Sequence, residues 1–181
     1  VLEGGLGDDL LLGDAGNDRL YGQEGSDTLV SGFGNDFVYG GSGDDTLLGG
    51  SASQQQWTYD VLRGEDGDDH IQAGSKWTLA EGGAGSDTLV GGTEFSYLAG
   101  GDGNDSIAAG SGGGSLVGGG GDDTLAGGSY TDMLEGGPGS DIYHFARGGG
   151  WDRINDFEDE TDEGYIRGSD RVRFGDDIAP G

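Results

Sequence analysis

A nine-residue pattern of polar and hydrophobic positions repeats along most of the chain. Counted from Gly4, the units favour glycine at positions one, two and four, aspartate at position six and an apolar side chain at position eight. Five units run on from Gly4, and nine more run from Gly64 to His144. Between them, residues 49–63 form one unit with a six-residue insertion near residues 51–59. Such a fixed period predicts a solenoid of stacked units rather than a set of separate domains.

The eighth position of each unit predicts the core. One apolar residue between outward-facing neighbours is typical of a short strand, so we expect a three-residue strand in each unit and an all-β fold. Glycine in the turns can adopt positive φ and lets neighbouring backbones approach closely. The eighth-position residues are Leu11, Leu20, Leu29, Val38, Leu47, Leu62, Ile71, Ala80, Leu89, Leu98, Ile107, Leu116, Leu125, Leu134 and Tyr143.

Composition shows that this core is small. Apolar residues make up 31% of the 181 residues, whereas ordinary globular domains have about 45–50%. With 45 glycines and a net charge of −27, hydrophobic burial alone cannot offset the entropy lost on folding. The chain is therefore either a disordered acidic linker or a domain that folds with bound cations. The fixed phase of the apolar residue favours the second interpretation, because a linker does not need it.

Charge and residue content also exclude several classes of function. Nucleic acid is excluded as a partner, because no basic face exists to bind phosphates. No stretch approaches the roughly 18 apolar residues of a membrane-spanning helix, and the absence of cysteine excludes disulfides and thiolate metal sites. His70 and His144 fall at outward positions, and the glycine-rich turns lack the lysine of a phosphate-binding loop. We expect no catalytic residue in these units, and hence no enzyme activity of their own.

The units resemble the nonapeptide G-G-x-G-x-D-x-U-x of RTX (repeats-in-toxin) proteins, the hemolysin-type calcium-binding repeat, in which U is a large apolar residue. The resemblance implies a right-handed parallel β-roll with two nonapeptides per coil, each a six-residue calcium-binding turn followed by a three-residue strand. It also implies that each ion lies between successive turns on one edge, bound by aspartate and turn carbonyls. Oxygen ligands alone suit Ca²⁺ better than transition metals, and Mg²⁺ gives up its waters reluctantly.

With two units per coil, alternate turns lie along opposite edges of the roll, which we call the first edge and the second edge. Eight turns of the first edge all carry aspartate at position six, which predicts about seven calcium ions between them. The aspartates are Asp9, Asp27, Asp45, Asp69, Asp87, Asp105, Asp123 and Asp141. The glycines expected beside the ions are Gly5, Gly7, Gly25, Gly41, Gly43, Gly67, Gly83, Gly85, Gly101, Gly103, Gly119, Gly121, Gly137 and Gly139.

The second edge is less regular. Its position-six residues are, in order, Asp18, Asp36, Asp60, Thr78, Ser96, Gly114 and Asp132. We expect one calcium site between Asp18 and Asp36, and two sites at most on this edge. Lys76, Glu94 and Tyr130 replace the fourth-position glycine, which predicts turns of another shape because positive φ is unfavourable for these residues.

Aromatic residues stand at position five of the second edge, one coil apart. They are Tyr59, Trp77 and Phe95. Rungs about 4.8 Å apart would bring these rings into contact. Two interpretations follow: the rings pack on each other in place of missing ions, or they form a strip that binds a sugar or another ligand.

Residues 145–181 depart from the nonapeptide and resemble the segment that closes RTX blocks. A solenoid needs an atypical terminal unit to cover its open end, so we predict a capping segment here. Trp151, Ile154 and Phe157 are expected to cover the end of the core. Val172 and Phe174 are expected in a strand behind them.

The resemblance implies a monomeric calcium-binding module that folds outside the cell. In that role it supports bacterial type I secretion of a larger toxin or adhesin, with calcium and, transiently, the secretion machinery as its partners. The module is then secreted or at the cell surface. Two alternatives stay open: an accessory domain of a secreted metalloprotease, lipase or polysaccharide-modifying enzyme, and a glycan-binding adhesin module.

Overall fold

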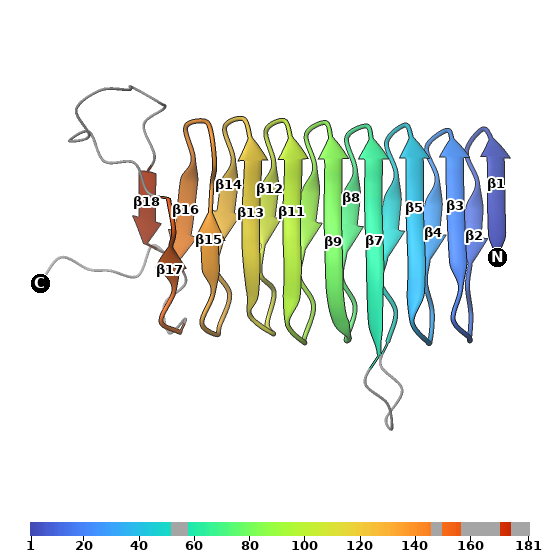
Figure 1. Cartoon of the computed structure of the whole chain (residues 1–181), viewed down its shortest axis with the longest axis horizontal. Coiled ribbons are helices and arrows are strands. Elements are labelled where there is room, and N and C mark those ends of the chain that lie inside the picture. The colour runs from blue at the N-terminus through green and yellow to red at the C-terminus, as the bar shows by residue number, and fades with distance from the viewer. Residues whose placement is uncertain (52–57, 146–149, 157–170, 175–181) are drawn as a thin grey trace, which may run out of the picture.

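The computed structural model is a β-solenoid of about eight turns, consistent with the expected β-roll (Figure 1). The structure describes residues 1–51, 58–145, 150–156 and 171–174. Two parallel sheets of nine strands each face one another, and successive strands alternate between them. The first edge lies at the top of Figure 1 and the second edge at the bottom. The described residues include no helix, and so none that could cross a membrane.

The sheet of odd-numbered strands has the longer strands. It contains β1 (Leu2–Leu6), β3 (Arg19–Glu24), β5 (Asp36–Ser42), β7 (Tyr59–Asp66), β9 (Trp77–Ala84), β11 (Ser96–Asp102), β13 (Gly114–Gly120), β15 (Met133–Glu135) and β17 (Arg153–Ile154). Many of these strands exceed the predicted three residues, because pairing continues into the first-edge turns; Gly41, for example, pairs with Gln23.

The sheet of even-numbered strands matches the expected length more closely. It contains β2 (Leu10–Leu12), β4 (Thr28–Val30), β6 (Thr46–Leu48), β8 (His70–Gln72), β10 (Thr88–Val90), β12 (Ser106–Ala108), β14 (Thr124–Ala126), β16 (Ile142–Phe145) and β18 (Arg171–Phe174). Most of these strands have three residues, and their pairing partners lie one coil apart, as Leu29 and Leu47 do.

The predicted core is confirmed. All fifteen eighth-position side chains are at most 5% exposed, and they form one continuous hydrophobic cluster between the sheets. The register also survives the insertion, because Asp36 pairs directly with Asp60. The insertion itself, residues 52–57, lies outside the described residues.

Close stacking of the turns explains the glycines. All fourteen glycines predicted beside the ions have positive φ. A Cβ atom on Gly119 would overlap the carbonyl oxygen of Gly101 in the preceding coil. Lys76, Glu94 and Tyr130 are not among the non-glycine residues with positive φ, so the different shape predicted for their turns is confirmed.

The predicted capping residues divide into those inside and those outside the core. Ile154 pairs with Leu134 and packs against the hydrophobic cluster. The expectation for Trp151 is wrong: its side chain is 91% exposed. The backbone N–H of Trp151 donates to Thr131 Oγ1. Thr131 lies one coil earlier, at an outward-facing position of its turn. The segment thus continues the nine-residue register, with Ile154 at position eight.

Two other capping predictions concern the last strand and the residue that follows Asp156. Val172 and Phe174 do lie in a strand, β18, which pairs with β16. Phe157 lies outside the described residues. The solenoid is therefore extended at this end by one further strand on each sheet.

Two adjacent glycines test how far the fold depends on turn stacking. Gly119 has φ of +118° and no room for a Cβ, whereas a Cβ on Gly120 would have only Asp102 Oδ1 nearby, at 3.7 Å. We predict that Gly119→Ala lowers the free energy of unfolding by about 1–3 kcal/mol. Gly120→Ala should change it by less than about 1 kcal/mol. Urea unfolding in saturating calcium measures both, and equal effects would contradict the stacking argument.

The end of the solenoid yields a second prediction. Ile154→Ala removes apolar contacts from the last rung of the core and should cost about 1–3 kcal/mol of unfolding free energy. Trp151→Ala, although it removes a larger side chain, should cost less than about 0.5 kcal/mol because the indole lies in solvent. The same urea experiment compares them, and a greater loss for Trp151→Ala would reverse the assignment.

Candidate metal centre

The position-six aspartates of the first edge form a ladder of identical hydrogen bonds. Each lies just before an even-numbered strand, and in seven successive pairs the backbone N–H of one aspartate donates to Oδ1 of the aspartate one coil later, at 2.7–2.9 Å. One carboxylate oxygen thereby joins neighbouring coils in seven of the eight turns. The structure brings together all eight aspartates that the sequence analysis predicted for this edge.

The second oxygen of these carboxylates is different. It is buried and has no hydrogen-bond partner among the described residues in seven of the turns, those of Asp9, Asp27, Asp45, Asp69, Asp87, Asp105 and Asp123. Burial of a carboxylate oxygen without a partner is costly, so a regular column of such oxygens favours the binding of a cation.

First-position glycines form the wall of this column. A Cβ on Gly22 would overlap both Asp27 Oδ2 and the carbonyl oxygen of Gly40 one coil later, so carboxylate and carbonyl oxygens share one space. Sequence analysis missed these glycines, although the signal was present. Position one is glycine in all eight first-edge units, at Gly4, Gly22, Gly40, Gly64, Gly82, Gly100, Gly118 and Gly136, but varies on the second edge.

The electrostatics of the column also favour a cation. Burial raises the pKa of Asp69 and Asp123 to about 7, and that of Asp45 and Asp87 to about 6, with neighbouring carboxylates adding to the effect. No group of three or more acidic or histidine side chains converges among the described residues. A bound ion would therefore take backbone carbonyls among its ligands, which suits a hard cation such as Ca²⁺.

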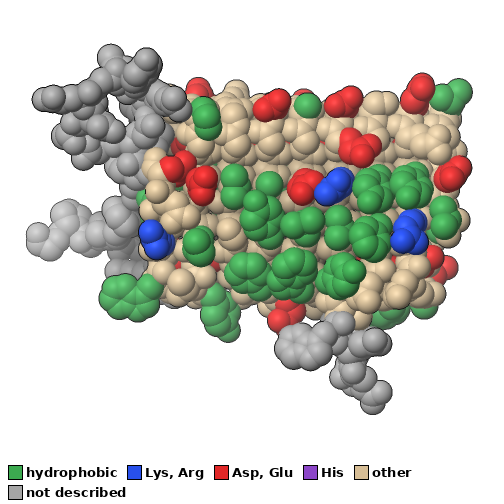
Figure 2. All heavy atoms as spheres, viewed as in Figure 1, with side chains coloured by type: hydrophobic (Ala, Val, Ile, Leu, Met, Phe, Trp, Pro, Cys, Tyr) green, Lys and Arg blue, Asp and Glu red, His purple; other side chains and the backbone are tan. Residues whose placement is uncertain are grey.

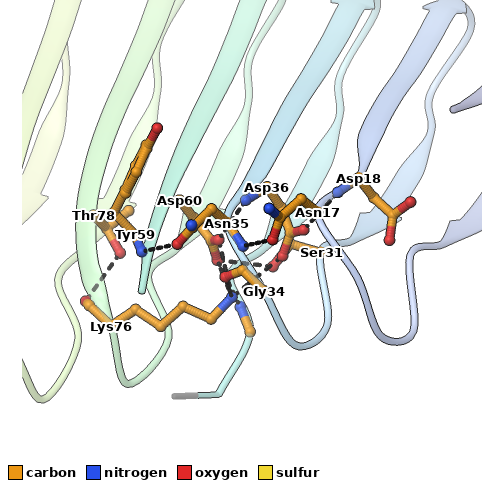
Figure 3. Close-up of polar contacts among 11 residues, drawn as sticks. Asn17, Asp18, Ser31, Gly34, Asn35, Asp36, Tyr59, Asp60, Lys76 and Thr78 are labelled. Carbon is orange, nitrogen blue, oxygen red and sulfur yellow. Dashed lines mark hydrogen bonds and ion pairs between the residues drawn. The ribbon is translucent and has the colours of Figure 1, made fainter. Parts of the chain in front are cut away.

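The first turns of the second edge have the same backbone hydrogen bonds, from Asp18 to Asp36 and from Asp36 to Asp60, but the carboxylates of Asp36 and Asp60 have further partners (Figure 3). Lys76 Nζ lies 3.2 Å from Asp36 Oδ2 and 2.9 and 3.1 Å from the two oxygens of Asp60. Asp60 Oδ2 also accepts hydrogen bonds from Ser31 Oγ–H and the Gly50 N–H. Burial raises the pKa of Asp36, and hydrogen bonds from the backbone and from Lys76 act in the opposite direction.

These contacts are not predicted by the repeat pattern, in which Lys76 stands only as a replacement for glycine. The one sign in the sequence is that Lys76 is the single lysine of the chain. The calcium site expected between Asp18 and Asp36 stays a prediction, and Lys76 now competes with it for Asp36. Asp132 at the far end of the edge accepts N–H groups from Gly114 and Gly128 on its two oxygens.

The predicted ring contacts are confirmed for one pair. The Tyr59 and Trp77 ring centroids lie 6.5 Å apart at 74°, and Phe37 joins them from the neighbouring coil. Tyr59, Trp77 and Phe95 nevertheless remain 40–44% exposed. Figure 2 shows hydrophobic side chains gathered on the face of the odd-strand sheet. The rings therefore pack together and also present a surface to solvent.

Comparison with known proteins gives one family. A sequence model of the RTX calcium-binding nonapeptide repeat matches residues 1–29, 21–53, 59–75, 81–116 and 117–151, most of the chain. No curated protein matches it.

The raised pKa values predict how the metal-free fold depends on pH. Between about pH 4 and 7 the folded carboxyls bind protons more tightly than the unfolded ones, so the free energy of unfolding falls as pH rises through this range. Calcium-free chain should therefore gain strand signal in circular dichroism when the pH is lowered from 8 to 5. The Asp69→Asn, Asp123→Asn double variant should respond less. A wild-type signal that is constant or weaker at pH 5 would refute this account.

Proposed function

Because the chain belongs to the RTX calcium-binding nonapeptide repeat family, and is thus a calcium-binding β-roll module, we propose that its ions bind along the first edge and drive its folding. The observation that carries this proposal is the column of seven buried Oδ2 atoms that have no partner in the part of the chain that the structure describes. Each ion takes the space between successive position-six aspartates, with turn carbonyls completing its oxygen ligands. Calcium there supplies the positive charge that offsets burial of the carboxylates.

Charge makes this folding conditional. With a net charge of −27, the ion-free chain is destabilised by repulsion between its own carboxylates. Its core is small, because each repeat unit contributes one main apolar side chain. Seven divalent ions would add 14 positive charges and leave −13. Because ions bind the folded coils and not the unfolded chain, the free energy of binding becomes free energy of folding.

Such a switch suits export. Extracellular calcium sites have dissociation constants of about 10⁻⁴–10⁻³ M, so cytosolic calcium is too low to fill them. The chain would stay unfolded inside the cell, pass through a narrow type I secretion channel and fold outside. We therefore infer that the module is secreted or displayed by a bacterium and assists export of a larger toxin or adhesin.

A second candidate rests on the aromatic side chains. Tyr59, Trp77 and Phe95 follow one another at one-coil spacing and stay partly exposed, and a row of exposed aromatic rings offers apolar faces on which sugar rings can pack. A glycan array with wild-type chain and Trp77→Ala, each with and without calcium, distinguishes an adhesin module from an accessory domain of a secreted enzyme. Binding that is lost in Trp77→Ala would support the adhesin.

Folding should follow calcium. At pH 7.5 the chain should lack strand signal in excess chelator and gain it cooperatively on calcium titration, measured by circular dichroism. Asp87→Asn should raise the calcium midpoint several-fold, because it weakens ligands on the first edge. Asp132→Asn is the matched control on the second edge, where both carboxylate oxygens have N–H donors, and should shift the midpoint less. Full strand signal in chelator would disprove calcium-driven folding.

A further inference from the structure

Lys76 is a buried cation at a position where the repeat has glycine. It occupies position four of its unit and is 1% exposed. A buried ammonium is tolerated only where it is paired and hydrogen-bonded. Here Nζ donates to the Gly34 carbonyl oxygen at 2.8 Å, as well as to the carboxylates of Asp36 and Asp60.

These partners are of the kinds proposed for calcium on the first edge. They are one turn carbonyl and the position-six carboxylates of two successive turns. The backbone bond of the first edge is present too, since the Asp36 N–H donates to Asp60 Oδ1 at 3.1 Å. The difference lies in the remaining oxygen: it has no partner along most of the first edge, but accepts from Lys76 in both Asp36 and Asp60.

The reach of the side chain adds a second point. Lys76 starts one coil beyond Asp60 and contacts residues of two earlier coils, so it joins three successive turns (Figure 3). The middle turn belongs to the unit that carries the insertion. The chain thus places a covalently attached positive charge at the coil whose turn departs most in length from the repeat.

We propose that Lys76 is a tethered substitute for a calcium ion, which closes the second edge between Asp36 and Asp60 and excludes calcium from that position. The proposal rests on calcium binding at the first edge. It implies that this stretch of the second edge needs no ion from solution, and that a latent calcium site lies beneath the ammonium.

Replacing the lysine by the glycine of the repeat tests the proposal. The measurement is bound calcium per chain by equilibrium dialysis of the whole chain at saturating calcium. Lys76→Gly should bind one ion more than wild type, because it frees two carboxylates and a carbonyl. Glu94→Gly is the matched control: it restores the same glycine one coil further on, where Thr78 and Ser96 offer no carboxylate, and should bind the wild-type number.

A second pair of variants decides the matter even if Lys76→Gly does not fold. Asp60→Asn should bind as many ions as wild type, whereas Asp87→Asn on the first edge should lose at least one. Loss of an ion from Asp60→Asn, or an unchanged count in folded Lys76→Gly, overturns the proposal for Lys76 alone. Wild-type chain that binds no calcium overturns the proposed function, and with it this inference.

Discussion

The structure depends on a carboxylate placed inside the turn of each coil. One oxygen receives an N–H from the preceding coil, which fixes the spacing of the stack, and the other projects into a space lined by glycine and carbonyl oxygen. In seven of the eight first-edge turns, no group among the described residues donates a hydrogen bond to that second oxygen. The same side chain therefore gives the solenoid its regular stacking and, in the folding that we propose, its dependence on cations.

The two edges solve this problem in different ways. The first edge carries aspartate in eight successive turns, and in seven of them a buried Oδ2 has no partner among the described residues. On the second edge the arrangement differs from turn to turn. The Lys76 ammonium pairs with carboxylates, two N–H groups donate to Asp132, and Thr78, Ser96 and Gly114 replace the aspartate by an uncharged residue. Because both edges belong to the same coils, irregular turns on one side are held in register by the regular turns on the other.

Periodicity predicted the fold and the first edge well, since both follow from the phase of a single residue type. Leu29 and its equivalents predicted the core, and Asp27 and its equivalents predicted the stacking of aspartates on one edge. The calcium ions expected between those aspartates stay a prediction. Features that break the period were harder to predict. The contacts of Lys76 reach 42 residues back along the sequence, to Gly34, and a repeat unit taken by itself gives no sign of them.

The prediction for Trp151 was wrong because its position in the nine-residue repeat was not recognised. Hydrophobic character suggested that it covers the core, but the nine-residue register assigns it to position five, which faces outward, and assigns Ile154 to position eight. The apparent change of pattern after His144 concealed a unit that continues the repeat. The role of the first-position glycines was hard to predict because these residues follow the period. Glycine is so common in this chain that its presence in every first-edge unit does not stand out.

Burial of Lys76 also affects the chemistry that the folded protein presents to its surroundings. Because the chain has one lysine and its ammonium is enclosed by oxygen atoms, the folded coils offer no lysine side chain to amine-reactive reagents or to proteases that cleave after lysine. The unfolded chain offers one such bond, near its middle. Accessibility of a single peptide bond thus reports whether the central coils are assembled.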